Sequence, residues 1–355
     1  MKLLDRYLAR TVLMAMLMVL GLMVAVELIF SLADELGDTT AVYHSGHAIA
    51  FVLLTTPTSI YELLPYAALG GALIGLGLLA SSNELVVMRS AGVTTRRIIW
   101  SVMKPTLLVM AFSLVLGEWL APMAEQKARS DQAMVLSGGE AIGSGRGNWH
   151  KIGDTYIHIN AVVPGGREVY GVTRYEFNGD RQLLRSSFAS HGRYLDAEGH
   201  WLLTEVQETR FREQRTEVVA HEQYEWQVDL PPELLSVLLV RPDRQSISGL
   251  YQFARYFESE GLESSNYFLA FWKKLLQPLA TISLVLLAIS FVFGPLREAT
   301  MGYRVFVGIM IALSFTIAER MLGPTTLLYG FSPLFAVLLP ILVAASLGLF
   351  MLRRV

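Results

Sequence analysis

The chain has 355 residues, of which 53% are hydrophobic and 17% charged, with a formal net charge of −2 and a mean hydropathy of +0.43. Soluble chains carry about a quarter charged residues, so this composition indicates a membrane protein. The near-neutral charge and the lack of a long basic run argue against a nucleic-acid-binding protein. The absence of cysteine excludes disulfides and thiolate metal sites.

The N-terminal segment is basic and is followed by an apolar run over Val12–Phe30. This run is too long for the core of a signal peptide and no small-residue cleavage site follows it, so we expect a retained transmembrane anchor. A helix needs about 20 apolar residues to cross the hydrocarbon core of a membrane. Six stretches meet that requirement: Thr11–Ala33, Ile60–Ala80, Trp100–Ala121, Leu269–Phe293, Val305–Leu322 and Leu334–Leu352.

The polar middle of the chain separates these spans into two groups of three. We predict three transmembrane helices over residues 1–124, an inserted domain over 125–265 and three more transmembrane helices over 266–355. The insert begins with the glycine-rich Gly138–Gly147 and then shows short alternating runs rich in Tyr, Val and Thr, with a turn signal at Asn178-Gly179. This pattern predicts an all-β domain, namely a sandwich, a jelly roll or an open barrel.

The distribution of Lys and Arg predicts the orientation, because short cytoplasmic loops are enriched in basic residues. Basic residues gather before the first span, between the second and third spans, between the fourth and fifth spans and at the C-terminus: Lys2, Arg6, Arg10; Arg89, Arg96, Arg97, Lys104; Arg297, Arg304; Arg353, Arg354. The loop over residues 34–57 contains none. We therefore expect both termini in the cytoplasm and the inserted domain on the outside.

No motif supports an enzymatic function. The chain lacks a phosphate-binding loop, a G-x-S-x-G nucleophile elbow and an H-E-x-x-H zinc motif, so we predict no catalytic residue and no metal site. Glu27 lies inside the first span, where either a proton relay or an interhelical hydrogen bond would explain it. Gly71 and Gly75 have the spacing of close helix packing, with the partner helix either in this chain or in another.

A short amphipathic segment lies between the second and third spans. We expect Ser82 to cap a helix that starts at about Asn83 and ends before Gly92. Leu85, Val86 and Met88 would give this helix an apolar surface. A plain loop does not need such a surface, whereas a helix in the headgroup region or a helix docked in a groove of another protein does. Physical reasoning leaves these two alternatives open.

Six short motifs, in the same order along the chain, resemble the permeases of lipopolysaccharide export, the LptF/LptG family, and the resemblance is nearer to the LptG branch. They are the segment from Asn83 to Gly92 (NELVVMRSAG), GEWLAP (Gly117–Pro122), SISGL (Ser246–Leu250), FWKKLLQPL (Phe271–Leu279), FGPLR (Phe293–Arg297) and GPTTLLYG (Gly323–Gly330). The arrangement of three spans, a β domain and three more spans also matches. Together the motifs cover essentially the whole chain.

The resemblance implies an α-helical membrane protein with six transmembrane helices and an inserted jelly-roll-like periplasmic domain. It implies a permease subunit of an ABC transporter that extracts lipopolysaccharide from the outer leaflet of the bacterial inner membrane and passes it through the β domain to a bridge. The implied partners are a sister permease of the LptF type, two copies of a cytoplasmic ATPase of the LptB type and a single-span periplasmic partner of the LptC type. ATP and Mg²⁺ would be bound by the ATPase, with no cofactor in this chain.

The alternative function is a non-transporting inner-membrane scaffold whose β domain binds envelope partners. Such a scaffold would not depend on a cytoplasmic ATPase, and the short helix near Glu84 would be dispensable. A lipid-modifying enzyme would need a cluster of catalytic groups at one depth, and the sequence does not suggest one.

The resemblance makes the helix at about 83–92 a coupling helix that meets the ATPase. The coupling residues are then Glu84, Leu85, Met88, Arg89 and Gly92. Glu84 would lie at the start of this coupling helix, which closure of the ATPase would push.

Lipopolysaccharide is an anion with several acyl chains, so its site needs cations and apolar walls. The candidate cations are Lys273, Lys274 and Arg320, which break the positive-inside pattern, although side chains snorkelling to the headgroups would look the same. The candidate walls are Phe30, Leu63, Leu69 and Phe315, for which ordinary packing is the alternative. Relatives carry lysines where this chain has Asp34, Glu35 and Asp38, so the anion would be held elsewhere or through divalent cations.

Overall fold

The computed structural model describes residues 2–40, 42–137, 148–152, 154–162, 166–179, 182–196, 198–212, 215–228, 232, 242–259, 264–295 and 299–353. The chain divides into two compact units. The first comprises Met1–Ser31, Thr56–Pro122 and Gln245–Val355, and the second comprises Leu32–Thr55 and Met123–Arg244. The predicted lead-in Gly138–Gly147 lies outside the described residues, as do Arg297 and Arg354.

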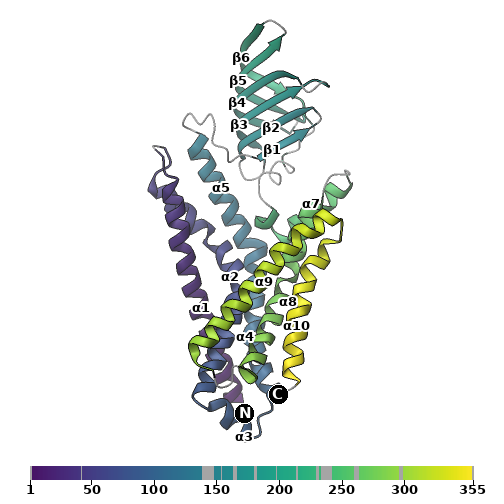
Figure 1. Ribbon diagram of the computed structural model, residues 1–355. Helices are drawn as coiled ribbons and strands as arrows, with labels where there is room; N and C mark the ends of the chain where they lie inside the picture. The colour runs from purple at the N-terminus through teal and green to yellow at the C-terminus, as the bar shows by residue number, and fades with distance from the viewer. Residues whose placement is uncertain are drawn as a thin grey trace. The chain divides into compact units, whose positions relative to one another are not determined.

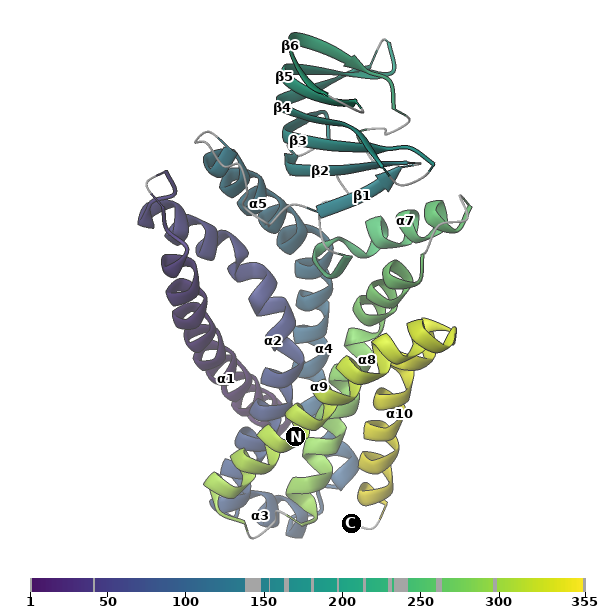
Figure 2. The same cartoon turned by 45° about the horizontal axis from the view of Figure 1, so that its top comes forward.

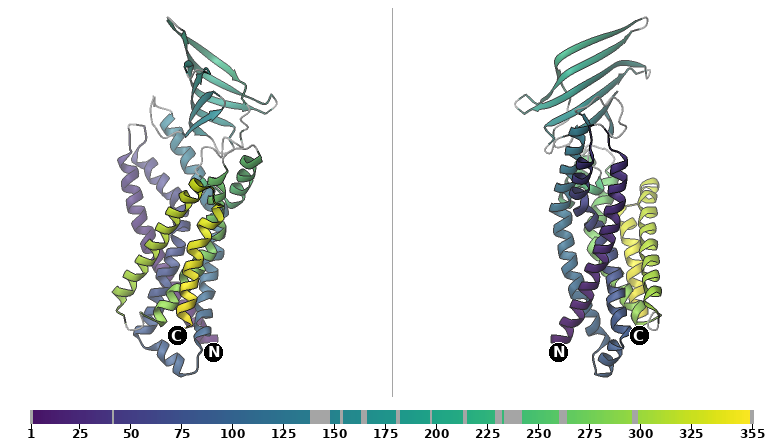
Figure 3. Two further views of the ribbon diagram at one scale, coloured as in Figure 1. Left: turned by 45° about the vertical axis from the view of Figure 1, so that its right-hand side comes forward. Right: turned by 90° about the vertical axis from the view of Figure 1, so that its left-hand side faces the viewer.

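Six helices among the described residues are long and apolar enough to cross a membrane, which confirms the predicted number of spans. They are α1 (Lys2–Gly37), α2 (Ser45–Ser81), α4 (Thr95–Val115) with its continuation, α8 (Ser265–Phe293), α9 (Met301–Tyr329) and α10 (Pro333–Leu352). Each is longer than the apolar stretch that predicted it. Figures 1 and 3 show α10 lying alongside α8 and α9 in the first unit.

Glycines of α2 bring α1 into close contact. A Cβ atom at Gly71 would lie 2.3 Å from the Cα atom of Met16, and one at Gly75 would lie 3.0 Å from the Cα atom of Val12. Only glycine leaves room for backbones this close. The partner of the small-residue motif is therefore α1 of the same chain.

Arg304 lies within α9 rather than in the loop where the sequence suggested it. Its side chain is buried, and its guanidinium Nη1 donates a hydrogen bond to the carbonyl oxygen of Gly77 in α2. A Cβ atom at Gly77 would approach Cδ of Arg304 to 2.9 Å. This arginine consequently joins α9 to α2 and does not face the solvent.

The inserted sheet forms the main part of the second unit and confirms the all-β prediction. Its strands are β1 (Asn148–Ile152), β2 (Thr155–Val162), β3 (Glu168–Phe177), β4 (Leu183–Leu195), β5 (His200–Arg212) and β6 (Arg215–Trp226). The strands are antiparallel and lie in the order β1-β2-β3-β4-β5-β6, as Figure 2 shows. Among these six strands every connection is a hairpin, and the crossed connections of a jelly roll do not occur.

The interior of the sheet is built from aromatic and branched side chains. Trp201, Leu203 and Val206 are fully buried in one cluster with residues of β2, β3 and β4. A Cβ atom at Gly192 would lie 2.7 Å from methyl groups of both Leu203 and Val169, so a larger residue here would require these side chains to shift. Alternating burial of this kind is typical of a sheet with one packed face.

Two helices lie in the region that the sequence analysis assigned to the β domain. The π-helix η1 (Leu116–Leu120) continues α4 and leads into α5 (Ala121–Ser137). Helix α7 (Ile247–Ser259) follows the sheet, and its Leu250, Ala254 and Phe257 are buried. Neither α5 nor α7 was expected from the sequence.

Candidate functional site

The short segment between the second and third spans folds as a helix, α3 (Glu84–Ser90). It lies at the same end of the bundle as the start of α1 and the end of α10 (Figure 1). Its start differs from the expected cap, because Asn83 precedes it in a left-handed conformation with φ of 60° and Ser82 does not cap it. Instead, the hydroxyl of Ser82 donates to the carboxylate of Glu84 at 2.9 Å.

The end of α3 depends on Gly92. This glycine has φ of +85°, the left-handed conformation that residues with a Cβ atom rarely adopt. Its amide donates to the carbonyl of Arg89, and the amide of Val93 donates to that of Met88, both at 3.0 Å. These two bonds form a Schellman motif, which satisfies carbonyls at the end of the helix and turns the chain toward α4.

The two faces of α3 have different neighbours. Leu85 and Met88 are buried in the core of the helical bundle. Val86 and Val87 point the other way, and Val87 is 63% exposed. Arg89 is also exposed. The apolar surface that is free to meet another molecule is therefore made by Val86 and Val87, and the sequence could not distinguish the two faces because both are apolar.

A groove runs beside this exposed surface. Its volume is about 450 Å³, and its walls come from α3 and from the ends of α2 and α8: Ala80, Asn83, Leu85, Val86, Arg89, Ser90, Val292 and Phe293. It combines an apolar floor with one exposed cation. Such a groove suits an apolar segment of a partner protein that also carries an acidic or carbonyl group.

Contacts with α1 and α4 hold α3 in place. The hydroxyl of Tyr7 in α1 lies close enough to the carboxylate of Glu84 to interact with it. Nearby, Arg97 and Asp5 form a bidentate ion pair with both N–O distances at 2.9 Å. Ser101 donates to the same carboxylate at 3.2 Å. Glu84 is thus placed beside α1, and the first turn of α4, which follows α3, is tied to the first turn of α1.

The three candidate cations for substrate occupy different environments. Lys274 is only 8% exposed, donates to the carbonyl of Gln245, and lies 5.3 Å from the ring centre of Tyr61. Lys273 is half-buried and close enough to Glu319 in α9 to interact electrostatically. Arg320 is exposed. Lys273 and Arg320 can therefore reach a ligand, whereas Lys274 already has a structural role.

The four candidate wall residues are not gathered in one cavity. Leu69 is buried in the core of the bundle, Leu63 is half-buried, and Phe30 is exposed on α1. Phe315 alone among them lines a groove of about 510 Å³ between α8, α9 and α10. The other side chains of that groove are apolar apart from Ser314.

One of the acidic residues after the predicted first span, Glu35, forms hydrogen bonds within the second unit. Glu35 accepts from the hydroxyl of Tyr43 at 2.9 Å and from the side-chain amide of Gln132 in α5. Among the residues that the structure describes, no group of three or more His, Asp and Glu has the geometry of a metal site. Glu35 consequently joins α1, the following loop and α5.

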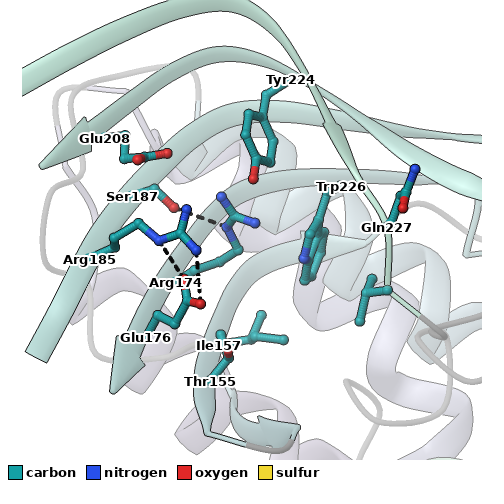
Figure 4. Close-up of a pocket in the computed structure, with 11 residues that line it drawn as sticks. Thr155, Ile157, Arg174, Glu176, Arg185, Ser187, Glu208, Tyr224, Trp226 and Gln227 are labelled. Carbon is teal, nitrogen blue, oxygen red and sulfur yellow. Dashed lines mark hydrogen bonds and ion pairs between the residues drawn. The ribbon is translucent and has the colours of Figure 1, made fainter. Parts of the chain in front are cut away.

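The sheet contains a polar pocket of about 310 Å³, shown in Figure 4. The guanidinium of Arg174 lies 4.9 Å from the ring centre of Tyr224 and 5.2 Å from that of Trp226, and its Nε donates to Ser187. Arg185 pairs with Glu176 at 2.7 Å, and this hydrogen-bonded ion pair raises the pKa of the Arg185 guanidinium. Both arginines are therefore already held by neighbours in the sheet.

Comparison with known proteins gives one consistent result. The family model for the lipopolysaccharide export system permease LptF/LptG matches residues 6–354. The lipopolysaccharide export system permease protein LptG of Escherichia coli strain K12 is 34% identical over 354 residues, which cover 99% of this chain and 98% of that protein. The protein of the same description from Haemophilus influenzae is 33% identical over 352 residues, with the same coverage.

Proposed function

The chain belongs to the LptF/LptG family of lipopolysaccharide export system permeases, and from this membership we propose that it is the LptG-type permease of an exporter in the bacterial inner membrane. It extracts lipopolysaccharide from the outer leaflet and passes it by way of its β domain to a bridge toward the outer membrane. It is a multi-pass membrane protein and not itself an enzyme.

The proposed complex contains a sister permease, two copies of a cytoplasmic ATPase and a single-span partner. ATP and Mg²⁺ belong to the ATPase. Both termini and α3 lie in the cytoplasm, and the sheet lies in the periplasm. In α1 and α9, only 11% of the apolar spanning segment is buried within this chain, the lowest share among the six spans. These two helices are therefore suited to border the sister permease and the lipid path.

The observation that carries this proposal is the exposed valine surface of α3 beside its groove. A seven-residue helix is too short to be stable alone, so packing of Leu85 and Met88 on the bundle must hold it. The exposed Val86 and Val87 then form a rigid apolar patch that has no partner helix among the described residues. We assign this patch as the docking surface of the ATPase and Glu84 as the residue that fixes its position.

The proposed substrate site is built on Lys273 in α8 and Arg320 in α9. Phosphate groups of the lipid would pair with these cations, and acyl chains would lie against apolar side chains such as Phe30 and Phe315. Lys274 is assigned to the structure of the bundle, since its ammonium is already bonded to Gln245.

The proposal is tested by Val87→Asp in the tagged chain, purified in detergent. A carboxylate in the centre of an apolar docking patch stays unpaired on binding, which costs about 2 kcal/mol or more and weakens association by a factor of about 30. We expect the variant to lose the co-purifying ATPase and its activity, whereas the wild type retains both together with a sister six-span permease.

Val218→Asp is the matched control, because Val218 on β6 is 71% exposed and the substitution is the same. Glu84→Ala and Ala91→Pro test the position of the helix rather than its surface. A wild-type chain that purifies alone, with no ATPase to lose, would contradict the exporter and favour the membrane scaffold.

A further inference from the structure

Three of the motifs singled out in the sequence meet at one place in the first unit. They are GEWLAP over Gly117–Pro122, SISGL over Ser246–Leu250 and FWKKLLQPL over Phe271–Leu279. Their contacts join η1, the start of α7 and α8, although up to about 160 positions separate them in the sequence. We call this contact region, formed by Tyr61, Glu118, Gln245, Ser248 and Lys274, the α7 junction.

Glu118 binds the first turn of α7. One of its carboxylate oxygens accepts from the backbone amide of Ile247 at 2.9 Å, and the other accepts from the hydroxyl of Ser248. The hydroxyl of Ser246 accepts from the amide of Gly249 at 3.1 Å, so the helix also has its own cap. A carboxylate at the positive end of a helix is stabilised by the helix dipole, and hydrogen bonds to an ionised acceptor are the stronger kind.

The π-helix places Glu118 and its neighbour where these contacts need them. A Cβ atom at Gly117 would lie 2.3 Å from the ring of Tyr61 in α2, so the ring packs directly on the backbone of η1. A π turn is wider than an α turn and carries an additional residue, which changes the direction of the side chains within it. Gly117 can therefore face α2 while Glu118 faces α7.

Lys274 of α8 binds the residue that precedes the first turn of α7. Its ammonium donates to the carbonyl of Gln245, just before α7, and lies over the ring of Tyr61. A buried ammonium is costly unless it is hydrogen-bonded and compensated. The carbonyl and the negative face of the aromatic ring supply that compensation.

A second set of polar contacts lies one helical turn further along α8 from Lys274. The side-chain amide of Gln277 donates to the backbone carbonyl of Tyr61 at 2.9 Å, and the hydroxyl of Ser113 donates to Gln277 at 3.4 Å. Gln277 lies in α8 like Lys274, and Ser113 lies in α4, which continues into the η1 that supplies Glu118. The first turn of α7 is thereby fixed to α2, α4 and α8 together.

The α7 junction lies, along the chain, between α3 and the unit that contains the sheet. Helix α3 ends at Ser90, α4 begins at Thr95, and α4 continues without a break into η1, which carries Glu118. One helix therefore connects the proposed docking surface for the ATPase with the start of α7. Arg244, the residue before Gln245, is the last residue of the unit that contains the sheet.

We propose that Glu118 and Lys274 are positioning residues for transport: they make α7 and the chain that returns from the β domain follow the movement of α4 and α8. This proposal rests on the proposed function, since it concerns how a stroke of the ATPase reaches the outer end of the permease. It assigns Lys274 and Glu118 to the transmission of movement and not to contact with lipid.

The test measures the number of lipid molecules released per ATP hydrolysed. The purified complex, with its ATPase, is reconstituted in proteoliposomes that contain fluorescently labelled lipopolysaccharide, and the wild type is compared with Glu118→Gln and Ser248→Ala. Loss of a charge-assisted hydrogen bond corresponds to a factor of about 10, so we expect the release ratio to fall about tenfold while ATP hydrolysis is kept. The amide of Ile247 should also exchange its hydrogen about tenfold faster.

Glu258→Gln is the matched control, because it is the same substitution on α7, the helix that Glu118 binds. Among the contacts described, Glu258 pairs only with the exposed Arg255, at 2.8 Å. Its release ratio should equal that of the wild type. An unchanged ratio in Glu118→Gln, or a parallel fall of ATP hydrolysis and release, overturns the positioning role. A wild-type complex without any ATP-dependent release would instead contradict the proposed function, and the two failures are therefore distinguishable.

A cross-link provides a rescue that a merely structural role would not show. The chain contains no cysteine, so Glu118→Cys with Ser248→Cys introduces the only two thiols. We expect this double variant to be uncoupled when reduced and to regain its release ratio when a short bis-methanethiosulfonate reagent joins the two thiols. Failure of the cross-linked form to regain the ratio overturns the proposal.

Discussion

Adjacent residues in this chain have opposite roles when burial separates them. Lys273 and Lys274 are neighbours in α8, yet only Lys274 is enclosed, with its ammonium bonded to Gln245 and facing Tyr61. The basic pair therefore provides one structural cation and one that is available to a ligand. Arg304 gives a second example, because it looks like a loop cation in the sequence and is buried against Gly77 in the structure.

At this scale the substrate site is tested by Lys273→Glu combined with Arg320→Glu. Reversal of two charges replaces attraction to lipid phosphates with repulsion, so photo-cross-linking of lipopolysaccharide to the complex should fall about tenfold. Cross-linking yield in membranes is the measurement.

The exposed pair Arg212→Glu and Arg215→Glu on the β5–β6 hairpin carries the same change in charge and serves as the control. Equal yields in both double variants would remove Lys273 and Arg320 from the site. Reversal at Lys274 would instead test folding, because its side chain is buried.

The helices are held together by two kinds of contact. Backbone contact joins α1 and α2, where Gly71 and Gly75 contribute no side-chain atom to the interface. Polar side chains join α2, α4 and α8, where Gln277 and Ser113 bond across the bundle. In a membrane, packing and hydrogen bonds must hold helices together, because lipid is as apolar as the helix surfaces.

Gly71→Leu tests the first kind of contact. The new side chain would clash with the backbone of Met16, and overpacking of this kind costs about 1–3 kcal/mol. We expect a lower midpoint of thermal unfolding in detergent, measured by the loss of the monodisperse peak in size-exclusion chromatography.

Gly21→Leu is the control, since no atom lies within 4 Å of a Cβ atom at Gly21 in α1. If the two variants unfold at the same temperature, α1 does not pack on α2 as described.

At the scale of the whole molecule, the sequence predicts what depends on local composition. The six spans follow from runs of about 20 apolar residues, and the sheet follows from alternating strands with turns between them. Helix α7 could have been predicted, because its buried Leu250, Ala254 and Phe257 recur at the spacing of an amphipathic helix. Its contact with Glu118 could not, because Glu118 is 129 positions away from Ile247. The exposed face of α3 was missed because only the packed bundle distinguishes Leu85 from Val87. Contacts between distant segments leave no local pattern.

The orientation of the molecule can be tested with single cysteines in a chain that has none. We expect a membrane-impermeant maleimide to label Val218→Cys on β6 once the outer membrane is opened, because this position lies in the proposed periplasmic domain. Ser90→Cys on α3 should react only after the inner membrane is opened as well. The opposite pattern of labelling would reverse the assignment of the two sides.

The π turn also has a consequence for how this sequence can change over generations. An α-helix turns by about 100° per residue, so deletion of one residue within η1 would rotate everything that follows on the helix by that angle. Glu125, buried and paired with Arg244 at 3.8 Å, would then point elsewhere. The hairpin turns of the sheet can gain or lose a residue at little cost, because such changes remain local. Length variation among descendants of this sequence is therefore expected in the hairpins and not between Leu116 and Glu125.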